Sequence, residues 1–99
     1  MKIKILDYRK MEAGKIRGFC NIELIVEGFA LTIKDVKVID GQEGGHFYAF
    51  PSKEYVNKEG EKKYFPLCAF YDKAGYQVFY DSMDKAFKDY FEQQDFKEV

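Results

Sequence analysis

Lysines and aromatic residues gather in one short segment of the chain. Four lysines fall within eleven residues and three rings accompany them: Lys53, Lys58, Lys62 and Lys63, with Tyr55, Tyr64 and Phe65. Ammonium groups attract phosphates, and aromatic rings stack on unpaired bases, so this mixture favours contact with nucleic acid. Three glutamates in the same segment leave it a net charge of only +1, and charged hairpin tips of this kind are usually just solvated.

Other residues with reactive side chains lack the partners that catalysis needs. His46 is the only histidine, and Cys20 and Cys68 fall in separate predicted strands, so we expect two reduced thiols and no metal site. Asp35 and Asp40 lie on opposite faces of a regular strand, whereas paired acid and base groups must lie together. We expect Asp35 to stabilise a bulge or remain solvated, and Asp40 to cap a turn.

Phosphate-binding loops and nucleophiles are equally weak in this sequence. Gly41, Gly44 and Gly45 precede a predicted strand rather than a helix, so they offer no helix N-terminus to a phosphate. Ser52 has no base near it in the sequence. We therefore predict that the protein is not an enzyme and has no cofactor and no small-molecule substrate.

Composition limits the chain to one small domain with many rings. The sequence has 99 residues, with ten Phe and eight Tyr but no Trp. A chain of this length buries roughly 60–70 % of its unfolded surface, which is too little to enclose every ring. Some rings should therefore lie at a contact with a partner. We predict a single domain over residues 1–92 and a frayed tail over 93–99.

Charge is nearly balanced overall but is unevenly distributed. The formal net charge is −1, and residues 69–99 hold 4 basic against 7 acidic side chains. If the protein has a basic surface, we therefore expect it on the N-terminal part of the chain. The sequence contains neither a signal peptide nor an apolar run of the ~20 residues that span a membrane, so we expect a cytoplasmic protein with no membrane partner.

Hydrophobic periodicity predicts strands first and one helix last. Alternation indicates strands over residues 2–8, 16–26 and 29–40, and the apolar parity changes near Lys34 and Asp35, which predicts a bulge there. Residues 46–52 are apolar on both faces, as in a strand covered on both sides, and Pro51 should lie at its end. Residues 53–63 are a predicted hairpin tip before a short strand, 62–68.

From about Asp72 the apolar residues recur at spacings of three and four, which predicts a long amphipathic helix. Seven large side chains share its apolar face: Tyr76, Phe79, Tyr80, Met83, Phe87, Tyr90 and Phe91. The predicted fold is α+β, with an antiparallel meander of about five strands and one long C-terminal helix that covers the sheet.

The segment from Phe29 to Lys53 resembles the SpoVG family of bacterial septation and sporulation regulators. That family has the pattern Val-x-Asp-Val-x-Val-x-Asp-Gly, a short glycine loop, then Phe-x-Ala-x-Pro-Ser-Lys. The matching positions here are Ile33, Asp35, Val36, Val38, Asp40, Gly41, Phe47, Ala49, Pro51, Ser52 and Lys53. The glycine loop is one residue longer than the family pattern, and the family's His-Pro appears as Phe65-Pro66.

The resemblance implies a homodimer that binds DNA or RNA and regulates gene expression or cell division. It carries a phosphate-contacting role most directly to Lys53 and less directly to Lys62, Lys63 and Arg17; we add Lys37 as a further candidate cation. Pairing two copies by symmetry would double a sparse set of lysines. The alternative is a protein-interaction or scaffolding module with the same dimeric fold, which binds partners through its aromatic and acidic helix and has little affinity for nucleic acid.

Overall fold

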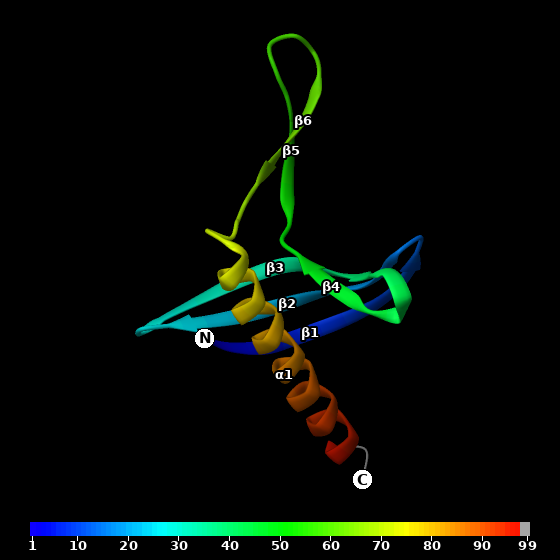
Figure 1. Ribbon diagram of the computed structural model, residues 1–99, viewed down its shortest axis with the longest axis vertical. Helices are drawn as coiled ribbons and strands as arrows, with labels where there is room; N and C mark the ends of the chain where they lie inside the picture. Colours follow the sequence, from blue (N-terminus) through cyan, green and yellow to red (C-terminus); the bar gives the residue numbers. More distant parts are fainter. Residues whose placement is uncertain (98–99) are drawn as a thin grey trace.

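The computed structural model describes residues 1–97 and has an α+β architecture, in which one long helix crosses one face of an antiparallel sheet (Figure 1). The elements in chain order are β1 (Lys2–Ala13), β2 (Ile16–Val26), β3 (Phe29–Asp40), a 3₁₀ turn (Gln42–Gly44), β4 (His46–Ala49), β5 (Ser52–Val56), β6 (Lys62–Pro66) and α1 (Lys73–Lys97). The predicted fold class is therefore confirmed in outline.

The strands form two sheets rather than one five-stranded meander. Strands β1 to β4 form a four-stranded antiparallel sheet in chain order, and β5 pairs only with β6. The two-stranded hairpin stands away from the rest of the molecule (Figure 1). We call it the arm, residues 52–66, and we call the four-stranded sheet with α1 the body.

Local chemistry explains the turn and the bulge of the main sheet. Glu27 and Gly28 both have positive φ, +39° and +88°, as a tight hairpin turn between β2 and β3 requires. The β2–β3 register shifts between Cys20 and Ile22, opposite the stretch that contains Asp35, whose φ is +61°. The change of parity in the sequence therefore predicted the bulge correctly.

Pro51 separates the body from the arm. It lies between β4 and β5, where its missing amide donor removes no sheet hydrogen bond. The base of the arm is closed where the Leu67 amide donates to the Pro51 carbonyl over 3.2 Å. The predicted strand over 46–52 is therefore two elements, because the chain turns out of the sheet after Ala49.

Helix α1 begins directly after a capping residue. The Asp72 carboxylate accepts a hydrogen bond from the Gly75 amide at 2.8 Å, and the Asp72 carbonyl accepts from the Tyr76 amide at 3.2 Å. The helix continues to Lys97, through most of the segment predicted as a frayed tail, and residues 98 and 99 lie outside the described chain. Among the described residues, no helix is long and apolar enough to cross a membrane.

The core lies between α1 and one face of the main sheet. Its buried residues come from all four strands and the helix: Ile3, Ile5, Cys20, Ile22, Val36, Val38, Tyr48, Phe79, Met83 and Ala86. The helix therefore covers one side only, and Phe47 on the other side of β4 is 41 % exposed. The prediction that this strand is covered on both faces is wrong, because the chain supplies a single covering helix.

Gly18 allows an aromatic ring to pack closely on the sheet. A Cβ atom at this position would lie 2.8 Å from the Tyr8 ring and 2.6 Å from the Arg9 carbonyl oxygen. No side chain fits in that space. The glycine in β2 therefore holds Tyr8 against the sheet, where its ring packs edge-on against Phe87 of α1 at 5.4 Å.

Candidate functional site

The arm brings two of the predicted cations and two rings onto one face. In the β5–β6 register Lys53 lies opposite Phe65, and Tyr55 lies opposite Lys63, so all four side chains point to the same side of the ribbon. Tyr55 is 45 % exposed and Phe65 is 61 % exposed. We call this set, Lys53, Tyr55, Lys63 and Phe65, the cationic face of the arm.

Ion pairs within the arm affect its lysines unequally. Lys62 points to the opposite face, where its Nζ lies 3.3 Å from a carboxylate oxygen of Glu54. Lys63 lies 3.6 Å from Glu61, and Lys53 forms no ion pair within the described part of the chain. Exposed pairs contribute only about 0.2–1 kcal/mol, so a phosphate can displace them.

Lys37 lies on the uncovered face of the main sheet and not on the arm. The strand pairings place Arg9, Phe19, Lys37 and Ala49 in one row across β1 to β4. The Arg9 guanidinium lies 6.0 Å from the centre of the Phe19 ring and 2.6 Å from a carboxylate oxygen of Asp35. Lys37 is therefore a cation beside a ring, but it belongs to a second surface.

Arg17 lies on the helix side of the sheet and pairs with Asp40. The pair neutralises the guanidinium, so Arg17 does not join the lysines of the arm. Asp40 was expected to cap a turn, and it bonds to Arg17 instead because the β2–β3 pairing brings the two strand ends together. Asp35 fulfils its predicted bulge role, since its amide donates to the Asn21 side-chain oxygen at 3.0 Å and its carboxylate binds Arg9.

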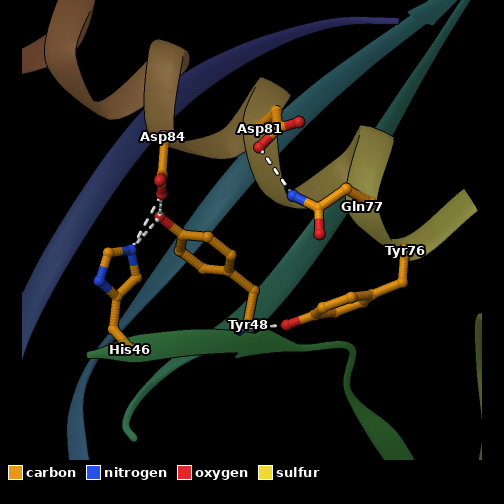
Figure 2. A network of polar contacts seen from close by, with 6 residues as sticks. All are labelled: His46, Tyr48, Tyr76, Gln77, Asp81 and Asp84. Carbon is orange, nitrogen blue, oxygen red and sulfur yellow. Dashed lines mark hydrogen bonds and ion pairs between the residues drawn. The ribbon is translucent and has the colours of Figure 1, made fainter. Parts of the chain in front are cut away.

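A polar network joins β4 to α1, as Figure 2 shows. The Tyr48 hydroxyl donates to an Asp84 carboxylate oxygen at 2.5 Å, and His46 Nε2 lies 2.9 Å from the same oxygen and 3.1 Å from the Tyr48 hydroxyl. Burial and the hydrogen bond to Asp84 both raise the pKa of Tyr48 well above its ordinary value. The phenol therefore stays protonated and holds the carboxylate in place.

This network lies in the wall of a cavity of about 280 Å³. Its other lining side chains include Arg17 and the rings of Tyr8, Phe87 and Phe91. The cavity was not predicted from the sequence, where His46 was considered only as a possible metal ligand. The available signal was the spacing of His46 and Tyr48, which places both side chains on one face of a strand.

Neither cysteine has a catalytic arrangement. Both are free; Cys20 is fully buried in the core, and Cys68 is partly exposed after the arm. Burial raises the pKa of the Cys20 thiol to about 12, which leaves it protonated and unreactive. Among the side chains that the structure describes, no three of His, Cys, Asp or Glu are placed to hold a metal ion.

Comparisons with known proteins give no relative for this chain. No protein-family model, curated protein or solved structure matches it. Its function is therefore argued from the residues and the geometry described above.

Proposed function

We propose that this chain is a small homodimeric regulator that binds DNA or RNA through phosphate contacts, as its resemblance to the SpoVG family implies. The observation that carries the proposal is the cationic face of the arm, where Lys53 and Lys63 alternate with Tyr55 and Phe65. The regulated process would be gene expression or septation, in the cytoplasm, without a cofactor and without catalysis.

The arrangement of this face suits an unpaired strand. Lys53 and Lys63 are diagonal neighbours across the ribbon, which places them about 7–8 Å apart at the backbone. Each lysine has an exposed ring directly opposite, so a base can stack beside a bound phosphate. Lys37, Lys62 and Arg17 are then secondary candidates, because none of them lies on the cationic face: Lys62 points to the other face of the arm, and Lys37 and Arg17 belong to the body.

The proposed dimer is supported by an open strand edge with exposed apolar side chains. Strand β3 pairs with β4 only from Lys37 to Asp40, so within the described chain its first half, from Phe29, has one unpaired edge. Phe29 is 71 % exposed, and Leu31 lines a groove of about 650 Å³ that extends to the base of the arm. A second copy is the proposed occupant, because strand edges of this kind pair with other chains.

Oligomeric state tests the dimer separately from nucleic-acid binding. Leu31→Lys places a charge on the open edge and should convert the dimer to a monomer in light-scattering measurements. Val78→Lys is the matched control, because Val78 is a similarly exposed apolar residue that lies on α1 and not on a strand edge. A wild-type chain that is monomeric at high concentration would rule out the dimer.

Binding at several salt concentrations tests the nucleic-acid proposal. Fluorescence anisotropy with labelled single-stranded DNA and RNA should show affinity that falls steeply with salt, at a slope of about −0.7 per neutralised phosphate. Lys53→Glu with Lys63→Glu should weaken binding and reduce the slope by about 1.4 per protomer. Lys85→Glu with Lys88→Glu reverses two exposed charges on α1 and is the matched control.

The proposal fails if neither DNA nor RNA binds at low salt, or if the helix variant loses as much affinity as the arm variant. The interaction module is then the remaining candidate. Most large apolar side chains of α1 pack on the core, and among its described residues only Val78 and Phe91 stay largely exposed. A protein partner would therefore bind the second face of the arm, where Val56 and Tyr64 are exposed, rather than the helix.

A further inference from the structure

The cavity beside Asp84 is independent of the arm. It lies between α1 and the helix-facing side of the sheet, and its lining residues come from β1 to β4 and α1. Its volume of about 280 Å³ is just below the range of roughly 300–1,000 Å³ that drug-sized ligands occupy. It can therefore hold a small molecule or one chemical group of a larger one.

Four aromatic side chains surround this space at two orientations. Tyr8 stands nearly perpendicular to Phe87 and Phe91, with interplanar angles of 87° and 82°. Phe87 and Tyr48 are nearly parallel, at 10°. These rings are in contact with one another, at centroid distances of 5.4–6.0 Å, so a ligand in the cavity lies against them along its wall and not between them.

The charges of the cavity favour a cation over an anion. Among the side chains that the structure describes, Asp84 carries the only carboxylate that lines it, and the hydrogen bonds from Tyr48 and His46 hold that group without neutralising it while the imidazole is uncharged. Arg17 is the cationic residue of the lining, and its charge is balanced by Asp40. The negative quadrupoles of the rings add to the same preference.

We infer that the Asp84 cavity binds a small organic ammonium group, with its methyl or methylene groups against the aromatic rings that line the wall and its charge beside the Asp84 carboxylate. The group could belong to a free amine or to a methylated lysine of a protein, and both present the same chemistry. This inference goes beyond regulation through the arm and contradicts the expectation that the chain takes no small molecule.

The test compares choline with its uncharged carbon analogue, 3,3-dimethylbutanol, by NMR titration of the labelled protein at about pH 8, where histidine is ordinarily neutral. We expect choline to shift the amide signals of residues around Asp84 and to bind at least tenfold more tightly than the alcohol. The same titration with a trimethyl-lysine peptide identifies the source of the ligand. If the peptide binds more tightly than choline, the natural ligand is a methylated lysine of a protein; if it binds less tightly, the natural ligand is a free amine.

Three variants make the result specific. Asp84→Asn should abolish the preference for choline over the alcohol, because the amide keeps an acceptor for Tyr48 but has no charge. Phe91→Ala should weaken choline binding without unfolding the protein, since Phe91 is 47 % exposed. Asp89→Asn removes an exposed carboxylate of the same helix outside the cavity and should change nothing.

Two outcomes would overturn the inference. Equal binding of choline and 3,3-dimethylbutanol would show that the cavity selects only for apolar bulk. Absence of choline binding in a protein whose spectrum is otherwise folded would show that the ring cluster serves packing alone. Neither outcome affects the proposal for the arm, because the arm contributes no residue to this cavity.

Discussion

The body and the arm contain the same kinds of residue but use them differently. In the body, Phe79 and Met83 are almost completely buried between α1 and the sheet. In the arm, Phe65 and Tyr55 lie on a two-stranded ribbon with no covering layer, so they stay exposed. Two-stranded hairpins have little stability of their own. Rings therefore stabilise the fold in the body, and in the arm they are available for recognition.

A matched pair of substitutions should separate these two roles most strongly. Phe79→Ala leaves a cavity in the core, and we expect it to lower the free energy of unfolding by about 3–5 kcal/mol. Phe65→Ala should lower it by less than about 0.5 kcal/mol. Urea unfolding followed by circular dichroism measures both values.

The two substitutions should have the opposite order of effect on nucleic-acid binding, where Phe65→Ala should cost more affinity than Phe79→Ala. Loss of the Phe65 ring should cost about 1–3 kcal/mol of affinity for a single strand if a base stacks on it. If Phe65→Ala destabilises the fold as much as Phe79→Ala does, the arm is part of the core and the distinction between the regions is wrong.

Gly18→Ala should be the next largest effect in the body. The added methyl group would collide with the Arg9 carbonyl oxygen and the Tyr8 ring, at 2.6 and 2.8 Å. Overpacking of this kind costs about 1–3 kcal/mol, measurable as a lower urea midpoint. Gly60→Ala in the arm would place its Cβ atom in open space, so it causes no collision. Its only cost is the backbone strain of an alanine at the positive φ of Gly60, +79°. Loss of nucleic-acid binding in Gly18→Ala protein that remains folded would contradict the assignment of function to the arm.

Alkaline pH should weaken the body through its buried thiol. Burial and the nearby Asp7 charge raise the pKa of Cys20 from 9.0 to about 12, so the folded chain keeps a proton that the unfolded chain loses. The contribution of this thiol to the free energy of unfolding is fully present below pH 9. It decreases between about pH 9 and 12, by at most about 1.4 kcal/mol per pH unit. Cys20→Ala should flatten that slope in urea titrations, and Cys68→Ala should not.

Glu27→Asn should have the smallest effect and should increase stability. Glu27 has φ of +39° in the β2–β3 turn, a conformation that asparagine before glycine adopts more easily. We expect a gain of about 0.5 kcal/mol in the free energy of unfolding. A decrease would indicate that the glutamate side chain has a role that its exposed position does not reveal.

Local patterns predicted the parts of the fold that depend on neighbouring residues. The strand limits at residues 26 and 29, the bulge at Asp35 and the helix from Lys73 all follow from hydrophobic spacing. The predicted meander of about five strands is wrong, because the strands form a four-stranded sheet and a separate two-stranded sheet. Pro51 marked a strand end, but nothing in the sequence shows that the next hairpin leaves the sheet.

The features that the sequence did not predict are contacts between segments that are distant in the chain. Asp84 meets His46 and Tyr48 only because α1 packs over β4, and a single sequence does not specify that register. The ion pair of Arg17 with Asp40 likewise depends on the pairing of β2 with β3, which the sequence does not specify. The pairing of lysines with rings in the arm is easier to predict from the sequence, because it depends only on the register of one hairpin.

Replacing residues 53–65 with an Asn-Gly turn tests the central claim most directly. The buried core residues all belong to the body, so the shortened chain should keep its helix and its cooperative unfolding. It should also lose salt-dependent binding of single-stranded DNA and RNA. A folded, shortened chain that binds nucleic acid with unchanged affinity and salt dependence would contradict the assignment of recognition to the arm.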